Sequence, residues 1–228
     1  MIQCIEEWLA KQQTGNNDLP PISIVSLNAR VSYAPSTAKF NLKTISNKVK
    51  SGFSPKFAEK SSKIQKGRVA IKFKWPTPAT VFVFKSSQFL IMHAKSEEHI
   101  HLIADKVDKF LAKTLKQKPT SFSVSIFNVT ATYAMPQDCK NLCIKEIASE
   151  ADKFWYSLGA AGILAHYEPN LFSGMVWKRT MFDNGKKATV SINAFQGGKM
   201  TITGTWDIKK LQLALKEFLS FIKCSQTA

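Results

Sequence analysis

The sequence has few acidic residues. Its 228 residues include 16 Asp and Glu against 32 Lys and Arg, which gives a formal net charge of +16. Such an excess favours a polyanionic partner, namely DNA, RNA or an acidic membrane surface. The basic residues are concentrated in one stretch, because residues 39–74 hold 11 of them and one acid, Glu59.

Long hydrophobic runs are also missing. No apolar run reaches the roughly 18 residues that a membrane span needs. The first 13 residues are too polar for the core of a signal peptide, so we expect the chain to stay inside the cell. A content of 44% hydrophobic and 21% charged residues is ordinary for a folded domain and argues against general disorder.

Cysteine and histidine are sparse and scattered. Cys139 and Cys143 are separated by three residues, with no other Cys or His nearby, so the four ligands of a structural zinc site are absent. The four histidines lie apart, without the spacing of a metal site or of a nucleophile–base pair. We therefore expect no catalytic residue, no metal and no cofactor.

Apolar periodicity divides the first half of the chain into elements. We expect strands at residues 22–33, 68–75, 79–84 and 88–94. We expect helices at residues 1–13, 41–50 and 96–115, the last capped by Ser96. The stretches between them that we expect to be irregular are a linker at 14–21 and a basic loop at 52–67.

The pattern then begins again. Residues 22–46 match residues 122–146 at an offset of 100 without gaps, so that Asn28 meets Asn128. The strand–turn–strand segment that starts at residue 79 recurs at an offset of 111, and each copy closes with a long amphipathic helix. The chain is therefore predicted to be a tandem duplication. Its parts are an N-terminal arm at 1–21, a first repeat at 22–118 and a second repeat at 119–228.

Each copy gives a strand, a helix, three antiparallel strands and a second helix. This order predicts an α+β fold, in which an antiparallel sheet carries its helices on one face. Alternation along the strands places Asn28 and Arg30 on the other face in the first copy, and Asn128 and Thr130 in the second. A free face that mixes such polar groups with Leu and Phe is neither a core nor an ordinary solvated surface, and it would suit partly apolar base edges.

Four segments are distinctive: YEPNLFSGMVWK at 167–178, QGGKMTITG at 196–204, SPKF at 54–57 and AKSEE at 94–98. Together they resemble the TATA-binding protein family. The resemblance extends over about residues 22–223 and is more specific in the second repeat. It implies a curved, saddle-shaped sheet formed by a pseudo-symmetric duplication, with helices on the convex face and the concave face in the minor groove of DNA.

The resemblance implies two pairs of intercalating rings, Phe172 with Phe195 and Phe57 with Phe84. Such rings open the base steps at the ends of the site. Wedging a side chain between bases costs a few kcal/mol per step, which the larger wrapped surface offsets. Pyrimidine–purine steps unstack most easily, so deformability itself selects A·T-rich sequences that contain them.

The resemblance also implies a set of base-contacting side chains: Asn28, Arg30, Phe82, Leu90, Met92, Asn128, Thr130, Asn193, Thr201 and Thr203. The family surface is mostly Val, Leu, Thr and Phe, which accepts A·T edges and excludes the guanine amino group. Arg30, Met92 and Asn193 depart from that pattern and change its hydrogen bonding and shape. In addition, His93 stands where the family has Gly.

Further contacts follow from the same resemblance. Phosphate contacts are expected from Lys72, Lys74, Lys178 and Lys199. Glu168 matches an acidic position beside the contact with a transcription factor IIB-like protein. The implied role is transcription initiation at promoters, with double-stranded DNA, that factor and RNA polymerase as partners. The implied location is the nucleus in a eukaryote, or a viral factory or host nucleus for a viral protein, and no membrane or small-molecule substrate is expected.

Two other classes of function compete with this interpretation. An enzyme would need a catalytic domain, yet only the 21-residue arm lies outside the duplication. A protein-interaction module that keeps the fold but has lost TATA specificity is the stronger alternative, because the predicted DNA-binding face carries the departures described above.

Overall fold

Contacts divide the chain into two compact units. The computed structural model describes residues 19–33, 39–53, 63–65, 67–74, 76–116, 121–135, 144–153, 155–183 and 186–226. One unit spans residues 25–128 and is called the first-repeat unit here; residues 129–228, with the chain up to residue 24, form the second-repeat unit. Among the described residues, the hydrogen-bonded order of the ten strands is β2-β3-β4-β5-β1-β6-β10-β9-β8-β7.

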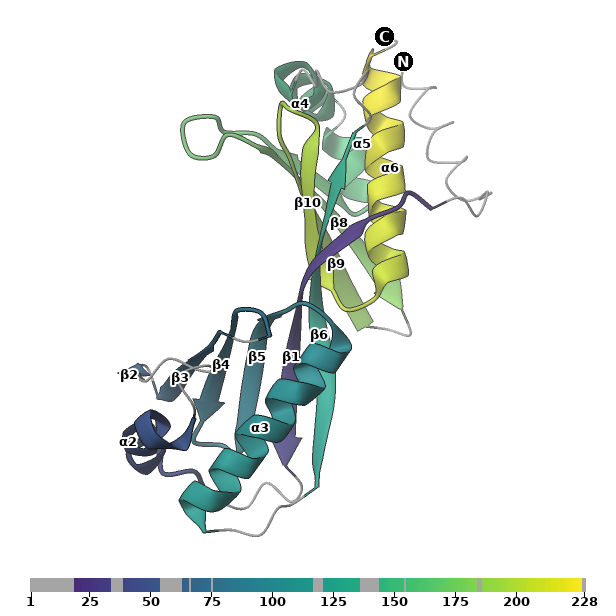
Figure 1. Ribbon diagram of the computed structural model, residues 1–228. Coiled ribbons are helices and arrows are strands. Elements are labelled where there is room, and N and C mark those ends of the chain that lie inside the picture. The colour runs from purple at the N-terminus through teal and green to yellow at the C-terminus, as the bar shows by residue number, and fades with distance from the viewer. Residues whose placement is uncertain are drawn as a thin grey trace. The chain divides into compact units, whose positions relative to one another are not determined.

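The first-repeat unit combines an antiparallel sheet with two helices (Figure 1). Its elements are β1 (Ser23–Tyr33), α2 (Leu42–Gly52), β2 (Lys63–Gln65), β3 (Arg68–Phe73), β4 (Ala79–Phe84), β5 (Gln88–Ala94), α3 (Glu97–Leu115) and the first part of β6 (Phe122–Ala134). Both helices begin at a polar cap. The Asn41 side chain accepts a hydrogen bond from the Thr44 amide, and the Ser96 side chain accepts one from the His99 amide, as the sequence predicts for Ser96.

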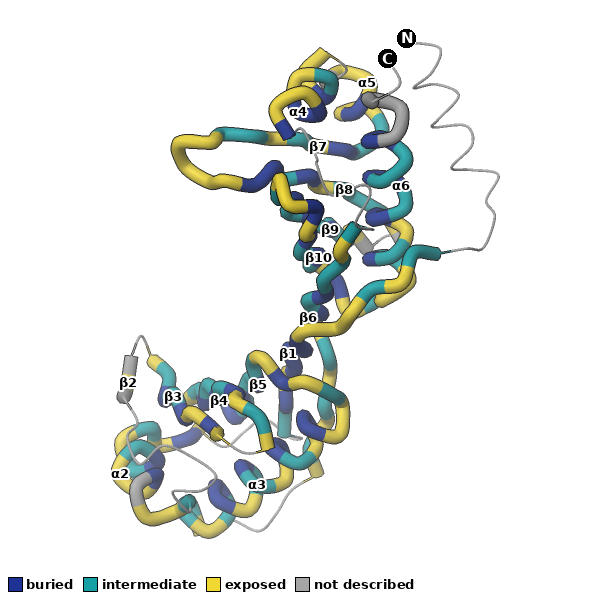
Figure 2. Tube along the Cα trace, turned by 45° about the horizontal axis from the view of Figure 1, so that its top comes forward, coloured by how far each residue is buried: buried dark blue, intermediate teal, exposed yellow. Residues whose placement is uncertain are grey.

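Alternating side chains build the core of this unit. Val69, Val81 and Ile91 are fully buried and lie on the sheet face under α2 and α3. Phe53 joins the layers, because its ring centroid lies 5.3 Å from that of Phe73 on the sheet and 4.6 Å from that of Phe110 on α3. The opposite sheet face is only partly buried, and Figure 2 shows this alternation along the strands.

The second-repeat unit repeats this plan. Its elements are the second part of β6, α4 (Ile144–Lys153), α5 (Trp155–Ala160), β7 (Ile163–His166), β8 (Met175–Asp183), β9 (Lys186–Ala194), β10 (Lys199–Thr205) and α6 (Ile208–Gln226). The ring of Trp177 on β8 packs against Phe218 and Phe221 on α6, at centroid distances of 5.3 and 4.9 Å. Helices therefore cover one face of an antiparallel sheet here too, and the predicted α+β class is confirmed.

The structure adds elements that the sequence did not predict. Within the described residues, each repeat has four strands after its first helix rather than three, because β2 and β7 are present as well. Both are short edge strands of three and four residues, too short to show a period. β2 lies inside the stretch 52–67 that was predicted to be a loop. The predicted helix at 1–13 lies outside the described residues.

Candidate nucleic-acid interface

The open face is defined here as the sheet face of each unit that its helices leave uncovered. In the first-repeat unit it carries half-buried side chains on the adjacent strands β4 and β5, most of them large and apolar. The Cα partners are Phe82 with Leu90, Thr80 with Met92, and Phe84 with Gln88. Arg30 is exposed and stands opposite Leu90. The predicted base-contacting residues of this repeat other than Asn28 thus lie together on one surface.

A cation lies on this apolar surface. The guanidinium carbon of Arg68 lies 4.1 Å from the ring centroid of Phe82, which is cation–π geometry. Arg68 is the first residue of β3, and its Cα partner on β4 is Phe84. The sequence did not single out Arg68, although its place beside Phe84 could have been inferred from the strand pairing.

The open face of the second-repeat unit is richer in polar groups. Thr203 has Thr130 and Ser191 as its Cα partners on the two neighbouring strands. The hydroxyl oxygens of Thr130 and Thr203 lie 3.4 Å apart. In the next row, Thr201 stands between Thr132 and Asn193. Thr130, Asn193, Thr201 and Thr203 were predicted to contact bases, whereas Thr132 and Ser191 were not. All six side chains are half-buried.

Phe172 and Phe195 form a ring pair at the end of this face. Their centroids lie 5.5 Å apart with an interplanar angle of 67°. Phe172 is 40% exposed. Gly174 allows this packing, since a Cβ there would come within 2.8 Å of the Phe172 ring and 3.0 Å of the Phe195 ring. The structure therefore brings together the two rings that the sequence paired, and it adds Gly174, which the sequence did not single out.

Backbone turns hold this ring pair. The carbonyl of Glu168 accepts hydrogen bonds from the amides of Leu171 and Phe172, at 3.0 and 2.9 Å. The amide of Phe195 donates to the carbonyl of Lys199. Beside Phe195, a hollow of about 910 Å³ is lined by Tyr133, Lys199 and Thr201, among others. Aromatic, basic and hydroxyl groups thus converge near the ring pair.

The two predicted central asparagines differ in their surroundings. Asn28 is buried, and its Oδ1 accepts a hydrogen bond of 3.0 Å from the amide of His93. His93 has a left-handed backbone with φ of 64°, and the pairing of β1 with β5 shifts register between Leu27 and Ala29. Asn128, in contrast, is half-buried. The Asn28 side chain therefore stabilises the bulge between β1 and β5.

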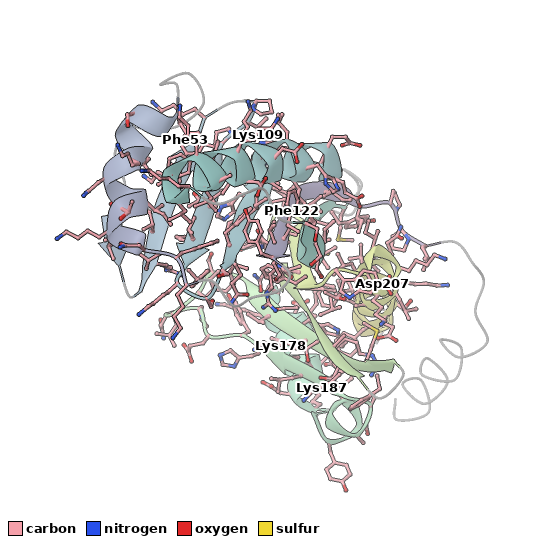
Figure 3. The ribbon with its side chains drawn as sticks, turned by 90° about the horizontal axis from the view of Figure 1, so that it is seen from below. Phe53, Lys109, Phe122, Lys178, Lys187 and Asp207 are labelled. Carbon is pink, nitrogen blue, oxygen red and sulfur yellow. The ribbon has the colours of Figure 1, made fainter. Side chains whose placement is uncertain are left out.

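The four predicted phosphate-contacting lysines are all exposed: Lys72, Lys74, Lys178 and Lys199. Positive charge is not confined to the open faces, however. A groove of about 700 Å³ between α2 and α3 has Phe53 and Phe110 in its lining. Figure 3 labels Phe53 and Lys109, two of the residues that line it. Its lining also includes five lysines, at positions 48, 106, 109, 113 and 116. Part of the net charge therefore lies on the helical side, away from the open face.

Burial shifts the pKa of three groups, all on the helix side of the sheets. It raises the pKa of Tyr33, whose hydroxyl donates to Asp108. It raises the pKa of Glu217, an effect that the paired Arg179 partly offsets. It lowers the pKa of His99, whose Nδ1 accepts from the Lys95 amide. These groups lie against the helices and do not form an acid–base site on the open face.

Phe57, the predicted partner of Phe84, lies outside the described residues. Over the described part of the chain, no group of three or more His, Cys, Asp or Glu side chains could hold a metal ion. No helix in that part is long and apolar enough to cross a bilayer.

Comparison with known proteins agrees with the geometry. The family model described as "Transcription factor TFIID (or TATA-binding protein, TBP)" matches residues 123–224. Among solved structures, the chain is similar to Methanococcus jannaschii TBP, with a TM-score of 0.60 and 21% sequence identity. That match covers 90% of this chain and 99% of the archaeal one. Comparison with curated protein sequences gave no significant match.

Proposed function

We propose that this chain is a divergent member of the TATA-binding protein family and that it binds the minor groove of A·T-rich promoter DNA and bends it. The family match over the second repeat supports a DNA-binding transcription factor of the TATA-binding type rather than an enzyme. Beyond the family resemblance, we propose which surface contacts the DNA, which groove it enters and how the duplex is bent. Both open faces contact the duplex, and the Phe172–Phe195 pair wedges a base step.

The observation that carries this proposal is the ring pair. Phe172 and Phe195 lie against each other at the edge of the open face, and Phe172 remains 40% exposed. Burying a Phe side chain fully is worth about 1.5–3 kcal/mol, so leaving such rings in water disfavours the unbound state. Unstacked bases offer an apolar surface of matching shape, and insertion of the Phe rings between them would kink the duplex.

The rest of the open face suits the same partner. Thr201, Thr203 and Thr130 offer hydroxyls to base edges, while Leu90 and Met92 offer apolar contact. The exposed lysines 72, 74, 178 and 199 supply phosphate contacts, whose counterion release makes affinity fall with salt. Together these groups recognise shape and charge more than individual bases, which is how minor-groove proteins act.

The bent complex would serve transcription initiation. We propose that a factor IIB-like protein binds beside Glu168 and that RNA polymerase follows. Glu168 supports this role because its carbonyl begins the turn that presents Phe172, so a partner there would contact the wedge segment directly. In a eukaryotic cell, this activity would place the protein in the nucleus.

Direct binding measurements test the proposal. A gel-shift titration should show the chain binding an A·T-rich duplex more tightly than a G·C duplex of the same length. A small A·T minor-groove ligand such as distamycin should compete, and methylation in the major groove should not matter. Absence of binding to either duplex would contradict the proposal and favour a protein-interaction module, to which the exposed Leu171 and Phe172 would then contribute.

A further inference from the structure

Asn193 is the open-face residue whose chemistry differs most from that of its counterpart in the other repeat. It lies on β9, with Thr201 as its Cα partner on β10 and Val176 on β8. At the same strand position of the first repeat stands Phe82, between Leu90 and Ala70. The two positions are matched by the offset of 111 that also matches Phe84 with Phe195.

The carboxamide of Asn193 is available to a ligand. Its residue is half-buried, with Val176 on one side, and among the described residues the side chain makes no hydrogen bond. A partly desolvated amide without a partner is costly, so a ligand that supplies one gains affinity. Asn is also one of the few side chains that can donate and accept at once.

The minor groove offers one group that calls for an acceptor. A·T and T·A pairs present only the acceptors N3 and O2, whereas a G·C pair adds the N2 amino donor of guanine. A face without acceptors must leave that amino group unpaired. A carboxamide can accept from it through Oδ1 and donate to a neighbouring N3 or O2 through Nδ2.

The first-repeat face has no such acceptor at the matched position. The guanidinium carbon of Arg68 lies 4.1 Å from the Phe82 ring centroid, and a guanidinium only donates. Leu90 replaces Thr201 in the same row, and Arg30, the Cα partner of Leu90, replaces Thr132, the Cα partner of Thr201. Arginines are attracted to the narrow, strongly negative minor groove of A·T tracts.

We infer that Asn193 accepts a hydrogen bond from a guanine N2 amino group, so that the half of the DNA site under the second repeat accepts a G·C pair and the other half excludes it. This inference rests on the proposed minor-groove binding. It makes the target site directional, since the two repeats no longer demand the same base pairs.

A scan of base pairs along one duplex tests the inference. Each A·T pair of an A·T-rich site is replaced in turn by G·C, and by inosine·C, which lacks the N2 amino group. For the parent protein, we expect G·C to bind at least as well as inosine·C at one position in one half. In the other half, we expect G·C to bind about tenfold more weakly than inosine·C.

Protein variants identify the residue. N193L should make the tolerant position discriminate against G·C by about tenfold, while inosine·C stays unaffected. The reciprocal change F82N should give tolerance to the other half. The matched control is N47L, the same substitution at an exposed position on α2, which should leave the whole profile as in the parent.

The outcomes separate the two proposals. If the parent binds no duplex, the proposed function fails and this inference fails with it. If the parent binds the A·T-rich site but G·C is penalised alike in both halves, or if N193L leaves the profile unchanged, minor-groove binding stands and the role of Asn193 is overturned. Should N193L fail to fold, the comparison of guanine with inosine on the parent protein decides alone.

Discussion

At matched positions, the two repeats have similar side chains in their cores and different side chains on their open faces. On the covered face, Val81 matches Ile192 and Ile91 matches Ile202, and all four are fully buried. On the open face, the first repeat presents Phe82 beneath Arg68, where the second presents Asn193. The covered positions must fill a closed core, which tolerates only small changes of volume. The open positions have no such constraint from the fold, so differences there report on the ligand.

The backbones of the two repeats also differ. At two matched positions with a left-handed backbone, the second repeat has Gly198 and Gly204, whereas the first has Ser87 and His93. A left-handed conformation costs a non-glycine residue roughly 1–2 kcal/mol. The first repeat therefore carries backbone strain that the second avoids, in keeping with its weaker resemblance to the family.

Exchanging these residues should change stability in opposite directions. G204A should destabilise the protein by about 3 kcal/mol, because a Cβ there would lie 2.0 Å from the Thr189 carbonyl oxygen. H93G should stabilise it by roughly 0.5–1 kcal/mol, since relief of strain exceeds the added entropy of the unfolded chain. Urea denaturation measures both. A stabilising G204A would contradict the close approach of Gly204 to the Thr189 carbonyl oxygen.

The ring pair gives the next comparison. G174A should weaken DNA binding about fivefold, or by roughly 1 kcal/mol, because a Cβ at that position displaces the rings of Phe172 and Phe195. R68A, at the matched position of the first repeat, should change affinity less, since Phe84 does not depend on it for space. Gel-shift titration measures both variants. Equal effects would mean that the open faces of the two units do not differ at these matched positions.

The phosphate contacts should be alike in both repeats. K178A on β8 and K72A on β3 occupy matched positions, and each should lower the slope of log affinity against log salt by about 0.9 without changing sequence preference. K109A, on the helical side, should leave the slope unchanged. A larger change in slope for K109A would indicate that DNA binds at the groove between α2 and α3.

The smallest expected effect concerns pH and the first repeat alone. Burial lowers the pKa of His99, whose matched residue in the second repeat is Lys210. Protonation of His99 is therefore less favourable in the folded than in the unfolded state, so stability is complete above its unfolded pKa of about 6.5 and declines as pH falls below it. Urea midpoints at pH 7.5 and 5.5 should differ less for H99N than for the parent. An unchanged difference would assign the pH dependence to other groups.

Periodicity predicted most of the fold because long elements carry a clear pattern. The strands β3, β4 and β5 and the helix α3 were predicted within a few residues, since each combines alternation or helical spacing with a cap or turn. The edge strands β2 and β7 were not, because three or four residues show no period. α5 was missed for the same reason, as it has six residues.

The candidate site was predictable only where strand alternation fixes the face. The pairing of Phe172 with Phe195 came from the family resemblance, and the structure brings the two rings together. The position of Arg68 over Phe82 depends on the rotamer of a long side chain, which no sequence pattern specifies. The role of Gly174 depends on a close approach of two rings from different segments, and this too is visible only in three dimensions.

DNA bending by the ring pair is the most direct test of the account. A fluorescence energy-transfer measurement on an end-labelled A·T-rich duplex compares the parent with F172A and F195A. The control is Y156A, which removes a more exposed aromatic ring from α5 on the helical side. The account predicts that the parent and Y156A bring the two ends of the duplex closer, and that F172A and F195A fold normally but lose most of this change. Full bending by both Phe variants, or none by the parent, would contradict it.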